Sequence, residues 1–133
     1  MLALLFVLAG VNHFRSPDFY DVMIPPPLPW PRFWTLLTGV LEVVGGVGLL
    51  LPRLRRVAAV GVITMLVVFL WVHVDMLREP PDWDGRPVPA WLLWLRLPLQ
   101  FVLIACVWWV GMGRGTGLEG AEPAVARPQE VDR

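Results

Sequence analysis

Three apolar runs dominate this chain, and each is long enough to cross a lipid bilayer as a helix. Residues 33–51 contain one charged side chain, Glu42; residues 57–74 contain none; residues 91–110 contain one, Arg96. A transmembrane helix needs about 20 mainly apolar residues to cross about 30 Å of hydrocarbon. Of the 133 residues, 56% are hydrophobic and 17% are charged, whereas soluble domains carry about 25% charged residues. We therefore predict an integral membrane protein rather than a soluble enzyme.

Residues 1–14 form a fourth apolar run, which is shorter than the other three. A signal peptide would begin with basic residues and end at a small-residue cleavage site. No basic residue precedes this run, and it passes directly into Asn12, His13 and Phe14. A re-entrant segment would also fit the length. We favour a real first helix, and a start codon chosen too far downstream would account for its shortness.

These runs predict an all-α fold, an integral membrane four-helix bundle with helices at about 1–14, 33–51, 57–76 and 91–110. Residues 1–110 are the predicted transmembrane domain. Residues 111–133 are rich in Gly, Glu and Pro, which predicts a disordered cytoplasmic tail.

A short interfacial helix is expected on the outer face after the first run. Ser16 and Pro17 are typical of a helix start, because Ser caps free backbone N–H groups and Pro suits the first helical position. The expected helix covers residues 17–23, and Phe19, Tyr20 and Met23 would rest it on the bilayer surface.

Positive charge indicates the orientation. The turn between the second and third runs contains Arg53, Arg55 and Arg56, and cytoplasmic loops are enriched in basic residues. We therefore place this turn and both termini in the cytoplasm, so that loops 15–32 and 77–90 lie outside.

Composition excludes several classes of function. Acidic and basic residues number 11 each, so no basic surface for nucleic acid is expected. The single cysteine, Cys106, excludes an intramolecular disulfide and a Cys-cluster metal site, and we interpret it as a small buried hydrophobic residue. Neither a Ser-His-Asp arrangement nor a pair of carboxylates can be argued, so we do not expect catalytic activity of its own.

Polar side chains inside the apolar runs are the candidate functional residues, because an ionisable group in a membrane span is costly and usually has a partner and a role. At about 1.5 Å per residue, Glu42 lies roughly 13 Å below the outer surface and Arg96 roughly 7 to 8 Å below it. The predicted ligand-binding set falls in the same outer half and consists of Asn12, His13, Glu42, His73, Arg96 and Gln100.

Small residues beside Glu42 predict close helix packing. Gly39, Glu42 and Gly46 share one helical stripe, and small residues allow a neighbouring backbone to approach. We assign Gly39, Gly45 and Gly46 to helix packing. A dinucleotide or phosphate loop is not credible there, because no strand precedes these glycines.

The pairing of Glu42 leaves two interpretations open. Arg96 and Gln100 are four residues apart and share a face, and the long stem of Arg96 could reach Glu42. The two charges could form an ion pair that fixes helix packing, or they could belong to a ligand or proton site. His13 and His73 lack a third strong ligand, so no metal is predicted.

Four motifs together resemble the DoxX-like family of small bacterial membrane proteins. They are LAGVNHF at residues 8–14, IPP with LP at residues 24–29, GVLEVVGG with LLLPR at residues 39–53, and LRLPLQ at residues 95–100. The resemblance covers about residues 4–110 and implies a four-helix bundle in the bacterial cell (inner) membrane, with links to respiratory and thiol redox systems. Many relatives carry Pro and Asn near residues 69–73, where this chain reads FLWVH, so a role of that Asn does not carry over.

From these residues we predict a non-catalytic, redox-associated membrane subunit or a small-molecule-binding protein with a polar pocket open to the outer face. A quinone head group would fit such a pocket, which makes quinone the candidate cofactor. The predicted partners are the lipid bilayer, a membrane or periplasmic (extracellular) redox protein, and a second copy of the chain. Two alternatives remain: a small oligomeric transporter or permeation protein, and a structural assembly partner without a ligand.

Overall fold

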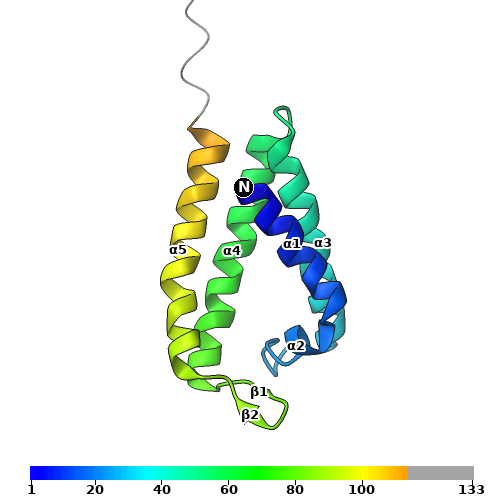
Figure 1. The fold of residues 1–133 in the computed structure, drawn as a ribbon, viewed down its shortest axis with the longest axis vertical. Coiled ribbons are helices and arrows are strands. Elements are labelled where there is room, and N and C mark those ends of the chain that lie inside the picture. Colours follow the sequence, from blue (N-terminus) through cyan, green and yellow to red (C-terminus); the bar gives the residue numbers. More distant parts are fainter. Residues whose placement is uncertain (114–133) are drawn as a thin grey trace, which may run out of the picture.

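The structure is a computed structural model that describes residues 1–113, in which helices predominate (Figure 1). In chain order the elements are α1 (Leu2–Arg15), α2 (Pro17–Asp21), α3 (Pro31–Leu50), α4 (Arg55–Arg78), β1 (Asp82–Trp83), β2 (Arg86–Pro87) and α5 (Ala90–Met112). Helix α5 continues two residues past the expected end at residue 110. The rest of the predicted tail, residues 114–133, lies outside the described residues.

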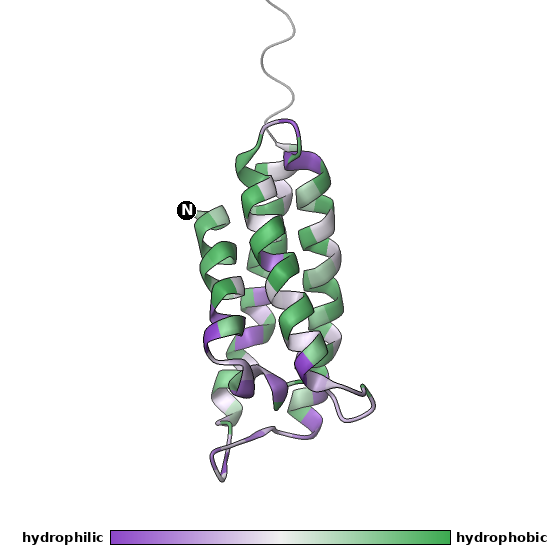
Figure 2. Cartoon of the chain, turned by 90° about the vertical axis from the view of Figure 1, so that its right-hand side faces the viewer, coloured by the Kyte–Doolittle hydropathy of each residue, from purple (hydrophilic) through white to green (hydrophobic). Residues whose placement is uncertain are grey.

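Three helices, α3, α4 and α5, are long and apolar enough to cross a membrane, whereas α1 is a shorter apolar helix. Figure 2 shows hydrophobic residues along the helices and hydrophilic residues gathered toward the two ends of the molecule. The prediction of a mainly helical chain with three apolar helices of membrane-spanning length is confirmed. The four-helix membrane bundle, with its inside and outside faces, stays a prediction.

The four apolar helices pack as two pairs, α1 along α3 and α4 along α5, and α3 also contacts α4 (Figure 1). Glycine allows the first pair to approach closely. A Cβ atom added at Gly39 would lie 2.7 Å from the Cβ atom of His13, and one added at Gly46 would lie 2.8 Å from the carbonyl oxygen of Ala3. Gly45 faces the other neighbour, since its added Cβ would lie 2.5 Å from Cγ2 of Val62 on α4. The glycines of α3 therefore serve two helix interfaces.

Two separate apolar clusters stabilise the fold. The first joins α1, α3, α4 and α5 and contains Ala3, Phe6, Leu49, Ala59, Val62, Leu66 and Val107. The second lies where α2 and the hairpin meet α4 and α5, and it contains Met23, Met76, Val88 and Leu93. The burial of Met23 contradicts the expectation that this side chain rests on the bilayer surface.

The segment 77–90, expected only as a loop, contains a small β-hairpin. Strands β1 and β2 pair in antiparallel register, with Trp83 opposite Arg86. Asp84 and Gly85 at the turn have φ angles of 56° and 73°, and an Asp-Gly pair with positive φ at both positions is the usual two-residue hairpin turn. Trp83 meets the ring of Phe19 edge to face, with centroids 5.0 Å apart, so the hairpin is docked against α2.

Candidate functional site

A cavity of about 410 Å³ lies between the two helix pairs. Phe6 and Leu66 from the first apolar cluster line it, as do Met23 and Met76 from the second, so the cavity separates the two clusters. Its size falls within the range of about 300–1,000 Å³ that is usual for small-molecule sites. Its polar lining comprises His13, Tyr20, Thr38, Glu42, His73, Arg96 and Gln100.

Five of the six predicted ligand-binding residues line this cavity: His13, Glu42, His73, Arg96 and Gln100. The sixth, Asn12, is not part of the lining. Its side-chain amide donates a hydrogen bond of 2.9 Å to the hydroxyl oxygen of Tyr20. The five residues, which the sequence places in the same outer half of the predicted bilayer, thus line one cavity, while their binding role stays a prediction.

His13 is held in one tautomer by helix α3. Its Nδ1 atom lies 3.0 Å from the carbonyl oxygen of Thr35 and 3.2 Å from Oγ1 of Thr38. The Thr38 hydroxyl has backbone carbonyl oxygens of its own helix as acceptors, at 2.9 Å and 3.0 Å. Because a carbonyl oxygen can only accept, Nδ1 of His13 carries a hydrogen and donates to Thr35. The other ring nitrogen, Nε2, is thereby turned toward Glu42.

Glu42 and His13 face each other in the buried interface between α1 and α3. Oε2 of Glu42 lies 3.7 Å from Nε2 of His13, and both residues are 7% exposed. This separation is too long for a hydrogen bond, and Oε2 has no hydrogen-bond partner among the described residues. The two groups are close enough to interact electrostatically, while Oε2 keeps its hydrogen-bonding capacity.

Arg96 faces sulfur atoms rather than an acid. One guanidinium nitrogen, Nη1, lies 3.4 Å from Sδ of Met23 and 3.8 Å from Sδ of Met76. Within residues 1–113 no acidic side chain forms an ion pair with Arg96, and Glu42 is paired with His13 instead. The interpretation of a Glu42–Arg96 ion pair is therefore wrong. Helix α5 packs on α4 rather than on α3, which leaves Arg96 and Glu42 on different sides of the cavity.

His73 on α4 and Gln100 on α5 both line the cavity, but they differ in their hydrogen bonds. Nδ1 of His73 is buried and has no hydrogen-bond partner among the described residues. Gln100, by contrast, donates from Nε2 to the carbonyl oxygen of Leu66 at 2.6 Å and thereby connects α5 to α4. Gln100 is thus part of the wall, whereas His73 retains hydrogen-bonding capacity. No group of three or more His, Cys, Asp or Glu side chains that could hold a metal ion occurs in residues 1–113.

Sequence reasoning missed Tyr20 and Thr38. The Tyr20 ring stacks on His13, with centroids 3.7 Å apart and planes at 23°, so it faces the cavity and not the bilayer surface as expected. Asn12 fixes its hydroxyl from the neighbouring helix. The sequence does offer one signal for this position of Tyr20. Only Ser16 separates α1 from α2, so α2 has to lie next to the end of α1. Thr38, one turn before Glu42, lies on the stripe already assigned to the interior.

A salt-bridge cluster ties α2 to the start of α3. Nε of Arg32 donates to Oδ2 of Asp21 at 2.8 Å, and Nη2 of the same guanidinium donates to Asp18. Because α2 has only five residues, it is too short to be stable as an isolated helix. These contacts therefore help to hold Tyr20 over His13.

Arg32→Gln should loosen α2 without unfolding the long helices, because exposed ion pairs contribute little to global stability. We expect faster hydrogen exchange of the backbone amides in residues 17–24 and an unchanged global unfolding transition. Arg15→Gln is the matched control, since Arg15 is exposed and makes no ion pair within the described residues. Equal exchange in the two variants would show that the Arg32 contacts do not hold α2.

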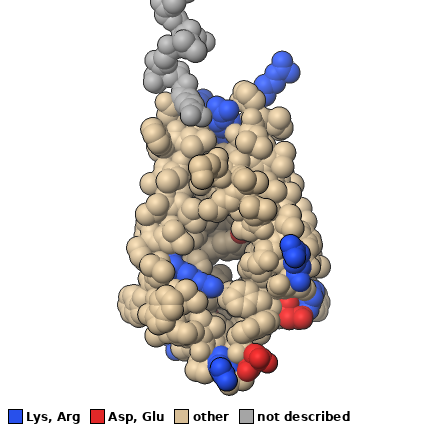
Figure 3. Space-filling model, in the orientation of Figure 1, with Lys and Arg blue, Asp and Glu red and all other residues tan. Residues whose placement is uncertain are grey.

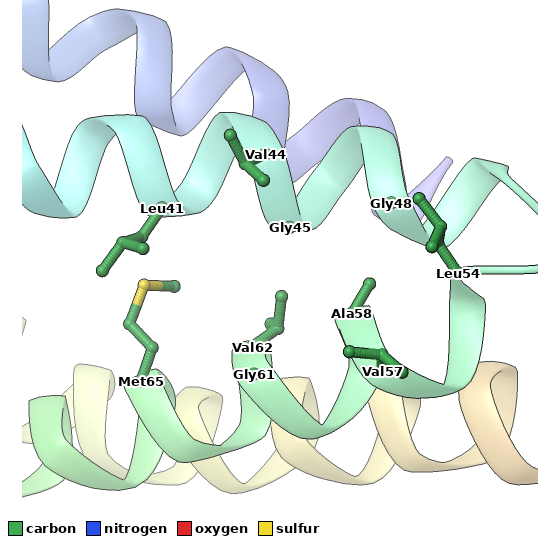
Figure 4. A pocket seen from close by; sticks show the side chains of 10 residues that line it. All are labelled: Leu41, Val44, Gly45, Gly48, Leu54, Val57, Ala58, Gly61, Val62 and Met65. Carbon is green, nitrogen blue, oxygen red and sulfur yellow. The ribbon is translucent and has the colours of Figure 1, made fainter.

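A second cavity, of about 270 Å³, lies between α3 and α4 near their connecting turn. Figure 4 shows Leu41 and Met65 extending across it toward each other, with Val62 directed at the backbone of Gly45. Every residue that lines it is apolar or glycine. It offers no group that could orient a polar ligand, so the polar cavity is the candidate site.

Fold and cavity together define a mainly helical protein with three helices of membrane-spanning length and a mixed polar and apolar cavity between two helix pairs. The chain belongs to the family described as Domain of unknown function (DUF8561), whose profile matches residues 2–111. No curated protein and no solved structure matches it. The matched range includes all residues that line the polar cavity. The resemblance to the DoxX-like family stays a prediction.

Proposed function

We propose that this chain is an integral membrane protein of the bacterial cell membrane that binds a small, polar-headed molecule in the cavity between α1/α3 and α4/α5. Three apolar helices of sufficient length support the membrane location, and α1, packed along α3, would complete a four-helix bundle. The turn with Arg53, Arg55 and Arg56 supports a cytoplasmic position for that end. The end that carries α2 and the hairpin is then external.

The observation that carries the proposal is the unused hydrogen-bonding capacity in one cavity. Buried polar atoms in proteins nearly always have a hydrogen-bond partner. Oε2 of Glu42 and Nδ1 of His73 are buried without one among the described residues, and both residues line the cavity with Arg96. They come from three different helices, so a molecule bound between them would meet donors and acceptors on several sides.

A quinone is the first ligand to test, in line with a redox-associated subunit. Its carbonyl oxygens accept hydrogen bonds, which suits Arg96 and His73, and its ring and tail suit apolar walls. A membrane or external redox protein would then be the partner. This part of the proposal rests on the DoxX-like resemblance and on the donor groups of the cavity.

The two alternatives are less well supported. A transporter needs a polar path through both halves of the bilayer. Between Val57 and Leu66 of α4, however, the one polar side chain is Thr64, whose hydroxyl donates to the carbonyl oxygen of Val60 in its own helix. A purely structural partner would leave the unpaired atoms of Glu42 and His73 without a purpose.

Filling the cavity should weaken binding. Ala9 lines the cavity, whereas Ala105 lies exposed on α5. We expect Ala9→Trp to weaken binding of a decyl-substituted benzoquinone by at least about tenfold, or about 1.4 kcal/mol, because the indole ring occupies the space of the ligand. Ala105→Trp should leave binding unchanged. Native mass spectrometry of the full chain released from detergent micelles measures the bound fraction. Equal binding by the two variants would place the ligand outside this cavity.

A further inference from the structure

The positive charge of Arg96 has no acidic partner in the polar cavity. Among the described residues that line it, Glu42 and Arg96 are the acidic and basic side chains. Glu42 lies against His13 on the α1/α3 side, and no acidic side chain of residues 1–113 forms an ion pair with Arg96. Arg96 keeps its charge in proteins. The α5 side of the cavity therefore contains a positive charge without an ion-pair partner.

A guanidinium beside two thioether sulfurs is poorly compensated. Sulfur in methionine is only a weak hydrogen-bond acceptor, and an unpaired charge in a low-dielectric site is costly. The partner that best matches a guanidinium is a carboxylate or phosphate group, which can accept two parallel hydrogen bonds. The Arg96 site therefore has the chemistry of an anion site, and no carboxylate of residues 1–113 forms an ion pair with it.

His73 adds a second donor on the neighbouring helix. It lies one turn before Met76 on α4, and Arg96 contacts the sulfur of Met76. Its buried Nδ1 atom has no partner among the described residues, so the proton of a neutral ring can reside there. Arg96 and His73 can thus bind one anionic head from two helices.

The cavity opens on the side of the molecule and not at its end. Leu5 of α1 and Leu99 of α5 both line it and are 48% and 52% exposed, so it reaches the surface between these two helices. Figure 3 shows the hollow in the side of the molecule, with basic atoms at its margin and acidic atoms deep inside. If the helices cross the membrane, this opening faces lipid. A ligand with an apolar tail could then enter directly from the bilayer.

We infer that the ligand is a single-chain amphiphile with an anionic head, a carboxylate or a phosphate, bound by Arg96 and His73 with its tail along the apolar wall toward Phe6 and Leu66. This inference rests on the proposed function and narrows its ligand class, since a neutral quinone would leave the charge of Arg96 uncompensated. Tyr20, His13 and Glu42 line the opposite side of the cavity.

The test compares the binding of ligands that differ in head group and tail to the full chain in detergent micelles. Palmitate and hexadecyl phosphate supply an anionic head with a tail, hexadecanol supplies the same tail without charge, and acetate and inorganic phosphate supply the anion alone. We expect palmitate or hexadecyl phosphate to bind with 1:1 stoichiometry, and hexadecanol to bind about 10- to 100-fold more weakly, the loss usual for a hydrogen bond to a charged group. Whichever of these two binds more tightly shows whether the site prefers a carboxylate or a phosphate head group.

Variants of Arg96 complete the test. Arg96→Gln should weaken binding of the anionic amphiphile about 10- to 100-fold and leave binding of hexadecanol unchanged. Arg96→Lys keeps the charge but loses the planar pair of donors, so its affinity for the anionic amphiphile should lie between those of Arg96→Gln and the unaltered protein. Arg78→Gln, at the exposed end of α4, is the control and should bind as the unaltered protein does.

The outcomes separate this inference from the proposed function. Equal binding of palmitate and hexadecanol, or binding of the decyl-substituted benzoquinone alone, would overturn the anionic head and leave the cavity as a ligand site. If acetate or inorganic phosphate displaced the anionic amphiphile at concentrations as low as its own, the tail would not contribute to binding, and that part of the inference would be overturned. Absence of binding by every amphiphile and by the quinone would overturn the proposed function itself.

Discussion

Gly46→Leu should disrupt the packing of α1 against α3, whereas Gly61→Leu should be tolerated. A Cβ atom at position 46 would lie 2.8 Å from the carbonyl oxygen of Ala3 and 2.9 Å from Cγ2 of Val7. The nearer of these atoms is backbone and cannot move unless α1 moves. We expect a loss of about 3 kcal/mol in the free energy of unfolding, the upper range for overpacking.

Gly61 provides a matched control on α4, because nothing lies within 4 Å of the Cβ atom that a substitution would add there. Unfolding of both variants in mixed micelles with increasing sodium dodecyl sulfate, followed by circular dichroism, measures the difference. The close α1–α3 interface would be contradicted if the two variants unfolded at the same detergent fraction.

His13→Ala should destabilise the protein strongly because it leaves Glu42 without its partner. Glu42 is 7% exposed, and His13 is the group with which it pairs among the described residues. Removal of one partner from a buried pair typically costs about 3–5 kcal/mol. If Glu42 is also replaced by Gln, much of this loss should be recovered, since the unpaired acid is then absent.

A double-mutant cycle over His13→Ala and Glu42→Gln isolates the coupling between the two side chains. Arg96→Gln is the matched comparison: no acid in residues 1–113 loses a partner there, so the variant should be as stable as the unaltered protein or more stable. Additive effects of His13→Ala and Glu42→Gln would show that the two side chains do not stabilise each other.

The apolar runs and the stripe around Glu42 were predictable because they depend on local periodicity. Helical spacing alone places Gly39, Glu42 and Gly46 on one face, and the structure shows that this face meets α1. Residue counts along the helices likewise placed His73 and Arg96 in the same half of the predicted bilayer as Glu42, and all three line one cavity. Distance along a helix axis follows directly from residue number, which is why this part of the candidate site could be argued from sequence.

The partner of Glu42 could not be predicted in the same way. Depth gives the level of a side chain but not which helices are neighbours, and both Arg96 and His13 lie at a suitable level. The close approach of Gly10 and Gly39 brings α1 onto α3, so His13 reaches Glu42 first. Adjacency of helices is decided by packing across the whole interface, for which a single sequence offers only weak signals.

The short helix at residues 17–23 was predicted and is present as Pro17–Asp21, but the hairpin and the position of Tyr20 were missed, for two different reasons. The hairpin has a recognisable signal in the Asp84-Gly85 pair, but this signal lies in a short loop between two long apolar runs and was read only as part of that loop. The inward position of Tyr20 has no such local pattern, because it depends on stacking with His13 from another helix. Tertiary contacts of this kind override the expectation that an aromatic residue in an external loop lies at the bilayer surface.

Photo-crosslinking tests most directly whether the cavity between the helix pairs holds the ligand. A palmitate analogue with a diazirine on its tail would be bound to the full chain, irradiated, and located by peptide mass spectrometry. We predict labelling of the cavity-lining residues Leu66, Phe69 and Leu103, suppressed by excess unlabelled palmitate. Labelling confined to outward-facing residues such as Val67 and Val102, or labelling that palmitate does not suppress, would contradict the account.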